Sequence, residues 1–241
     1  MTSIKKAIYL DYHATTPVDP RVAEKVVYYM TTAFGNAHST DHIYGDEAAK
    51  AVTQSRQNIA QLINTSPQEI IFTSGATESL NLAIQGSIKP NQKLKIAITT
   101  VEHKAVLDTC QALAKKGLAE IIFLEVDTQG KLNLNQLETV CKNGLSLLCI
   151  MAANNEIGNI YPIPEIGKIA QTYQIPWLCD ASQAVGKIPI NFRDWGITYL
   201  AISAHKLYEP KGIGALVIKK SHYLEPVSYT HLRAHETVLD L

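Results

Sequence analysis

Seven short runs of apolar residues alternate along the chain with segments whose apolar residues recur at helical spacing. The runs predict strands at 69–74, 95–100, 120–126, 145–152, 176–181, 199–203 and 214–219. Their valine, isoleucine and leucine residues are mostly continuous, which is typical of strands covered on both faces. Helical patterns lie between them at 76–85, 104–116, 134–141 and 163–173. This order predicts an α/β fold with three layers around a mostly parallel central sheet.

The chain divides into three parts: an N-terminal arm at 1–19, one α/β domain at 20–226 and a tail at 227–241. The domain opens with two helical patterns at 20–34 and 45–63. The tail is separated because it contains no apolar strand that could join the sheet. We interpret it as foreign sequence, for example vector translated at the broken end of a gene fragment. The spacing of His231, His235 and Glu236 is attributed to chance, and no metal site is predicted.

The charge balance excludes several classes of partner. Lysine plus arginine and aspartate plus glutamate both number 22, so the formal net charge is zero. Nothing in that balance indicates a nucleic acid or an anionic membrane surface as partner. The longest apolar stretch, at 145–153, is too short to span a bilayer, and the N-terminus has no secretory signal pattern. We therefore expect a cytoplasmic protein.

The four cysteines are expected to be structural. Cys110, Cys141, Cys149 and Cys179 have no C-x-x-C spacing and no histidines in a zinc pattern. Cys149 and Cys179 lie in predicted strands, and the other two lie in helical patterns. Free cysteine mostly behaves as a small hydrophobic residue, so we interpret all four as buried thiols in a reducing compartment.

A lysine lies just after one predicted strand, and an aspartate lies near the end of another. Lys206 comes just after the run 199–203, and Asp180 lies in the run 176–181. A lysine at a buried strand end has low dielectric around its amine, which favours the neutral nucleophile that forms a Schiff base. A carboxylate on a neighbouring strand can keep a pyridine nitrogen protonated. Together they are the protein's part of pyridoxal 5'-phosphate (PLP) chemistry, so PLP is the predicted cofactor.

Other polar residues fall at strand ends, where open α/β sheets bind ligands. Gly75 and Thr77 open a helix that could bind a phosphate, although taken alone the segment is better explained as an ordinary helix N-cap, because it is not a Walker loop. His103 could stack on a flat ring, or could simply begin a helix. Asn155 follows the run 145–152, and Gln183 follows the run 176–181 that contains Asp180. Five strand ends that all carry suitable polar groups indicate a ligand-binding site much more strongly than any one of these groups does alone.

Six motifs carry a resemblance to a known family. They are YLDYHATTPVDPRV, FTSGATESLNLAI, VEHKAVLDTC, NNEIG, CDASQAVGKIPI and SAHKLYEPKGIGAL, in family order from Tyr9 to Leu216. The chain resembles the large domain of the cysteine desulfurases, which are fold-type I PLP enzymes of the class V aminotransferase-like group. The resemblance implies that 20–226 is a PLP-binding large domain and that the substrate is L-cysteine. It also implies a homodimer that passes sulfur to iron–sulfur scaffold or other acceptor proteins.

The resemblance implies a role for each matching residue. Lys206 would hold PLP and then act as a base, and His103 would stack on the ring and assist proton transfer. Asp180 would pair with the ring nitrogen and Gln183 with the phenolic oxygen. The remaining cofactor-binding residues would be Asn155 beside the substrate and, around the phosphate, the backbone of Ala76 with Thr77, Ser203 and His205. The segment Ala14-Thr15-Thr16 and His42 fall where the family lines its pocket.

The chain departs from the family in two places. The family's sulfur-accepting loop cysteine, a downstream arginine and the C-terminal small domain are expected to be missing, because matching residues end near Pro226. This chain alone is therefore expected to be inactive. Glu209 stands where the family usually has glycine; a positive φ there would cost a glutamate about 1 kcal/mol.

Two other functions are compatible with the same motifs. One is a selenocysteine lyase-like enzyme of class V; the sequence of the missing loop would distinguish such an enzyme from a desulfurase. The other is a non-catalytic PLP-binding remnant, for which the expected observation is cofactor binding without turnover of cysteine.

Overall fold

A seven-stranded sheet forms the centre of the protein. The computed structural model describes residues 7–225, with sheet order β1-β7-β6-β5-β4-β2-β3. The strands are β1 (Ile70–Thr73), β2 (Leu94–Thr99), β3 (Ala119–Leu124), β4 (Leu147–Cys149), β5 (Trp177–Asp180), β6 (Tyr199–Ser203) and β7 (Gly214–Ile218). From β3 to β6 the neighbours are parallel, while β7 is antiparallel to both β6 and β1. Each predicted strand is present, which confirms the mostly parallel α/β sheet.

Helices cover both faces of this sheet. They are α1 (Pro20–Thr31), α2 (Ile43–Ile63), α3 (Ala76–Gly86), α4 (Lys104–Lys115), α5 (Leu134–Lys142) and α6 (Ile163–Thr172). One apolar cluster contains residues of α3 and α4, and the other contains residues of α5, α6 and the end of α2. Strand β2 contributes Ile96 and Ile98 to the first cluster and Ala97 to the second. Because both faces of the strand are buried, its apolar residues run without interruption.

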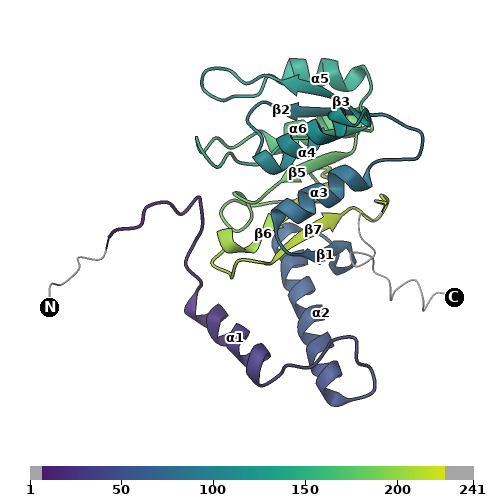
Figure 1. Ribbon diagram of the computed structural model, residues 1–241. Coiled ribbons are helices and arrows are strands. Elements are labelled where there is room, and N and C mark those ends of the chain that lie inside the picture. The colour runs from purple at the N-terminus through teal and green to yellow at the C-terminus, as the bar shows by residue number, and fades with distance from the viewer. Residues whose placement is uncertain (1–6, 226–241) are drawn as a thin grey trace.

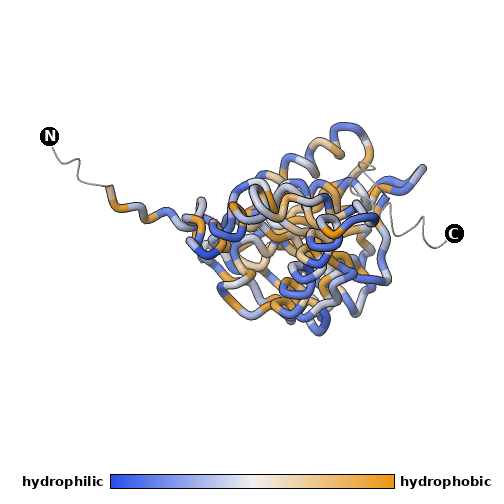
Figure 2. Tube along the Cα trace, turned by 90° about the horizontal axis from the view of Figure 1, so that it is seen from below, coloured by the Kyte–Doolittle hydropathy of each residue, from blue (hydrophilic) through white to orange (hydrophobic). Residues whose placement is uncertain are grey.

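The first two helices lie partly outside this layered body. Figure 1 shows α1 and most of α2 projecting away from the sheet. Helix α1 buries none of its residues, and exposed apolar side chains nearby include Met30, Phe34 and Ile43. The described start of the chain also leads away from the body, with Ile8 and Leu10 exposed (Figure 2). The boundaries at residues 19 and 226 stay predictions.

All four cysteines are buried, as the sequence predicted. Burial raises the pKa of the Cys141 thiol to about 11 and holds the pKa values of Cys149 and Cys179 well above their ordinary range. A thiol attacks or binds metal as its thiolate. The thiols at these three positions are therefore unreactive near neutral pH.

In the turn that follows β6 and Lys206, the residue with positive φ is not the one that the sequence predicted. Tyr208 has φ of 63°, whereas Glu209 is not among the described non-glycine residues with positive φ. Glu209 therefore carries no left-handed penalty. Tyr208 is held in place by the N-terminal arm, because its N–H donates to Thr16 Oγ1 (2.9 Å) and its carbonyl accepts from Asp19 N (2.8 Å).

No helix between residues 7 and 225 combines the length and apolar character needed to cross a membrane. The tail at 227–241, with His231, His235 and Glu236, lies outside the described residues.

Candidate active site

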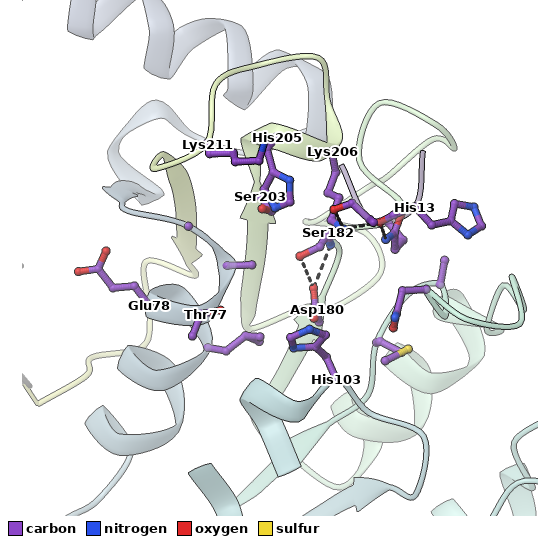
Figure 3. A pocket seen from close by; sticks show the side chains of 18 of the residues that line it. His13, Thr77, Glu78, His103, Asp180, Ser182, Ser203, His205, Lys206 and Lys211 are labelled. Atoms are coloured by element: carbon purple, nitrogen blue, oxygen red, sulfur yellow. Dashed lines mark hydrogen bonds between the residues drawn. The ribbon is translucent and has the colours of Figure 1, made fainter. Parts of the chain in front are cut away.

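A pocket of about 710 Å³ lies at the carboxyl ends of β2, β4, β5 and β6, beside the start of α3. Its polar side chains point toward a common centre in Figure 3. All the predicted site residues line it: Ala76, Thr77, His103, Asn155, Asp180, Gln183, Ser203, His205 and Lys206. Ala14 also lines the pocket, whereas His42 does not; it caps α2 by accepting from Gly45 N at 3.2 Å. The structure thus brings the predicted residues together, and their roles stay predictions.

One end of the pocket is suited to an anion. Helix α3 begins at Ala76, and its N-cap Gly75 provides no side-chain acceptor for the N–H groups of the first turn. Such N–H groups and the helix dipole attract phosphate. Across from Thr77, His205 and Lys211 lie side by side above Ser203 (Figure 3). These hydroxyl, imidazole and ammonium groups are the donors that a phosphate requires, so the residues present fit the phosphate of PLP.

His205 is oriented by the N-terminal arm. Its Nδ1 lies 3.1 Å from the Thr15 hydroxyl, which leaves Nε2 for a ligand in the pocket. Burial lowers the pKa of His205, and the positive charges of Lys206 and Lys211 lower it further. These influences favour the neutral form of the His205 imidazole.

The opposite end holds a buried carboxylate. Asp180 is 8% exposed, and its Oδ1 accepts from the backbone N (2.9 Å) and hydroxyl (2.6 Å) of Ser182. Both bonds use Oδ1, so Oδ2 is available to a cation that enters the pocket. A buried carboxylate is stabilised by such a partner, and the protonated nitrogen of a pyridine ring satisfies that requirement.

His103 lies beside Asp180 (Figure 3) and does two things at once. It is the N-cap of α4, where its Nδ1 accepts from Ala105 N at 3.1 Å. Because Nδ1 is an acceptor, the neutral ring carries its proton on Nε2. His103 is therefore a helix-start residue that also lines the pocket, and its stacking on a ring stays a prediction.

Lys206 follows β6 in a 3-10 turn (Ala204–Lys206), and its amine is held by the N-terminal arm. The amine donates to the carbonyl oxygens of His13 and Ala14. Burial lowers the pKa of Lys206, and nearby Lys187 lowers it further, against the opposing charges of Asp11 and Asp180. The lowered pKa increases the fraction of neutral amine, which is the nucleophilic form.

Gln183 is engaged by the same arm. Its Nε2 donates to the His13 carbonyl at 2.8 Å, and its Oε1 accepts from Lys187 at 2.8 Å. A ligand that bonds to Gln183 must therefore compete with these contacts. The arm is the main feature that sequence reasoning gave too little weight: Asp11 and His13 line the pocket, yet they lie about 190 residues from Lys206 in sequence. The early motif YLDYHATTPVDPRV was the available signal.

Gly214 of β7 sets the position of the anion-binding turn. A Cβ at this residue would lie 2.5 Å from the Ile202 carbonyl oxygen and 2.6 Å from the Gly75 Cα. We expect Gly214→Ala to push the Gly75 turn away from the sheet and to reduce the free energy of unfolding by about 1–3 kcal/mol. The affinity for PLP should fall with it. Urea denaturation and cofactor titration measure the two effects.

A matched control is Gly167→Ala in α6, where the added Cβ would meet the Trp195 carbonyl oxygen at 1.7 Å, away from the pocket. That variant should lose stability while its folded fraction keeps the wild-type cofactor affinity. Unchanged cofactor affinity in Gly214→Ala would contradict the expected displacement.

Comparison with known proteins gives consistent matches. The Aminotransferase class-V family model matches residues 8–233. The cysteine desulfurase IscS of Neisseria meningitidis serogroup C / serotype 2a is 46% identical over 237 residues, which cover 97% of this chain and 58% of that protein. The chain therefore spans less than two thirds of the length of this curated relative. The matched range ends at residue 233, inside the segment that sequence analysis placed outside the family; the boundary there stays a prediction.

Solved structures show the same similarity to NifS-like proteins and related enzymes. A NifS-like protein superposes with a TM-score of 0.86 at 35% identity, covering 92% of this chain and 62% of its own. A structure described as SspA in complex with cysteine gives a TM-score of 0.88 at 36% identity, with coverage of 92% and 65%. Both similarities extend over nearly all of the fold described above.

Proposed function

The chain belongs to the class V aminotransferase family, and on that premise we propose that it is the cofactor-binding part of a PLP-dependent cysteine desulfurase. The observation that carries the proposal is a single pocket that combines Lys206, the buried Asp180 and an anion-binding helix start. The cysteine desulfurases among the relatives and the cysteine complex of SspA support L-cysteine as the substrate.

Different pocket residues would hold different parts of the cofactor. The first turn of α3 with Thr77, Ser203, His205 and Lys211 would hold the phosphate. Asp180, oriented by Ser182, would pair with the ring nitrogen, while His103 would lie against the ring. When bound, PLP supplies an electron sink that stabilises negative charge on the Cα atom of an amino acid.

Lys206 is the proposed base. Its lowered pKa provides a neutral amine once the carbonyl oxygens of His13 and Ala14 release it. That amine would hold the cofactor and then take a proton from Cα of the substrate. Proton transfer requires the side chain to be within hydrogen-bond reach of the proton, and both Lys206 and His103 line the pocket in which the amino acid would bind.

Sulfur transfer itself is assigned to a thiol outside the four cysteines of this chain. All four are buried, and burial raises the pKa of three of them. We therefore propose that the acceptor thiol comes from the part of the longer relatives that this chain does not match, with onward transfer to iron–sulfur scaffold or other acceptor proteins. A cytoplasmic homodimer completes the proposal, and the exposed apolar side chains of α1 and α2 support such an interface.

Exchange of the Cα hydrogen tests the proposal without requiring a sulfur acceptor. The PLP-loaded chain in deuterium oxide should exchange the Cα hydrogen of L-cysteine, measured by proton NMR, faster than an equal concentration of free PLP. Faster exchange with L-selenocysteine than with L-cysteine would favour the lyase alternative. Cofactor binding without any exchange would identify a non-catalytic PLP-binding protein and would overturn the proposed activity.

A further inference from the structure

Glu102 directly precedes His103 and connects two segments whose residues line the pocket. The side chain is 5% exposed, and its Oε1 accepts from Thr99 Oγ1 (2.7 Å) at the end of β2 and from Met151 N (3.1 Å) after β4. Asn154 makes a second connection, because its Nδ2 donates to the Val101 carbonyl at 3.1 Å. These bonds tie the segment that precedes His103 to the segment that precedes Asn155.

The other carboxyl oxygen of Glu102 has no counter-charge. Oε2 is buried without a hydrogen-bond partner, and no ion pair of Glu102 is present within residues 7–225. The titratable groups that influence it or are influenced by it are Asp180, Tyr161, Cys149 and Cys179, and none of these is a cation. An ionised carboxylate with a bare, buried oxygen is strongly unfavourable, and binding a proton removes that penalty.

The electrostatics agree with the geometry. Burial raises the pKa of Glu102 to about 8; the hydrogen bonds from Thr99 and Met151 oppose the shift, and the charge of Asp180 adds to it. At pH 7 the acid form therefore predominates.

We propose that Glu102 is a positioning residue that works as a neutral acid: it holds His103 and Asn155 on either side of the pocket and keeps a second negative charge away from Asp180. The part concerning Asp180 rests on the proposed function, since Asp180 is there the partner of the cofactor ring. The protonation state of Glu102 does not rest on it and is observable without cofactor.

Infrared spectroscopy of the cofactor-free protein tests the protonation directly. The wild type at pH 6 should show the C=O stretch of a protonated carboxylic acid, and the band should be lost in Glu102→Gln and should fade as the pH rises through about 8. The matched control is Glu209→Gln, which should keep the Glu102 band; burial also raises the pKa of Glu209, and this residue does not line the active-site pocket. A band that is undiminished in Glu102→Gln, or the absence of a band in the wild type, overturns the proposal.

Unfolding as a function of pH gives a second test. The pKa of Glu102 is raised from its ordinary value of 4.5 to about 8 on folding, so the folded state binds the extra proton between those values. The stabilisation is complete below pH 4.5 and is lost as the pH rises toward 8. The unfolding equilibrium constant of the wild type should therefore rise up to about tenfold per pH unit more steeply than that of Glu102→Gln. Parallel pH profiles would contradict a neutral Glu102.

Cofactor binding tests the positioning role. Glu102→Gln keeps an acceptor for Thr99 and Met151 and should keep the wild-type affinity for PLP, whereas Glu102→Ala should weaken it by about tenfold or more, because both donors lose their acceptor. Equal losses in the two variants would show that the negative charge, and not a neutral acceptor, is required. If the wild type itself fails to bind PLP, the proposed function fails while the infrared result still decides the state of Glu102.

Discussion

Lys206→Ala should abolish covalent attachment of PLP to this chain. After loading with PLP and reduction with borohydride, mass spectrometry of the wild type should find one cofactor on the peptide that contains Lys206. The variant should carry none there. The physical reason is the environment of this amine: burial lowers its pKa, and it lies in the pocket that also holds Asp180 and the start of α3. An exposed lysine stays protonated at neutral pH and reacts far less.

Lys211→Ala is the matched control, because Lys211 lines the same pocket but lies on its phosphate side, next to His205 (Figure 3). This variant should bind PLP more weakly and still carry the reduced adduct on Lys206. In Lys206→Ala, the adduct could instead form on Lys211 or Lys187 with the wild-type yield. That result would show that any lysine near the pocket can attach the cofactor, and that the environment of the Lys206 amine is not required. The assignment of Lys206 would then be wrong.

Asp180→Asn should weaken PLP binding by about 10- to 100-fold. The amide keeps the shape of the side chain and can still accept from Ser182, whose N and hydroxyl donate to Oδ1 at 2.9 and 2.6 Å. It cannot provide the negative charge that a protonated ring nitrogen requires. A hydrogen bond to a charged group contributes about 1.5–3 kcal/mol, which corresponds to this range of dissociation constants. Fluorescence titration with PLP measures the change.

Asp108→Asn, on the exposed side of α4, is the control for a general effect of losing one negative charge, and should bind PLP as the wild type does. A second readout is the absorbance of the bound cofactor as a function of pH. Its titration should shift in Asp180→Asn, because the ring nitrogen loses the carboxylate that favours its protonated form. Wild-type affinity together with an unshifted titration would remove Asp180 from its proposed role.

The sequence predicted those residues of the candidate site that lie at the carboxyl ends of strands. Asp180 is the last residue of β5 and Lys206 lies just after β6, and parallel strands place their carboxyl ends at one edge of the sheet. For that reason residues as far apart as Thr77 and His205 line one pocket. The resemblance added their individual roles, which local periodicity does not contain.

Other features depend on contacts that no local pattern encodes. The carbonyl oxygens of His13 and Ala14 hold the Lys206 amine across about 190 residues of sequence. Thr16 likewise holds the turn at Tyr208, so the left-handed residue is Tyr208 and not Glu209. In each case the backbone conformation or the side-chain partner comes from a segment that sequence analysis treated as a separate arm.

The sequence by itself determined the alternation of strands and helices, the mostly parallel sheet and the group of residues at its carboxyl edge. It did so because burial on two faces and helical periodicity leave direct traces in the order of apolar residues. Only the tertiary structure decided which groups surround each of those residues. The Glu102 carboxyl shows the difference: its neighbours Thr99, Met151 and Asp180 come from β2, from the segment after β4 and from β5. Burial raises its pKa to about 8, although the hydrogen bonds from Thr99 and Met151 oppose the shift. Dielectric environment is a property of packed atoms in three dimensions, so it emerges only when the chain has folded.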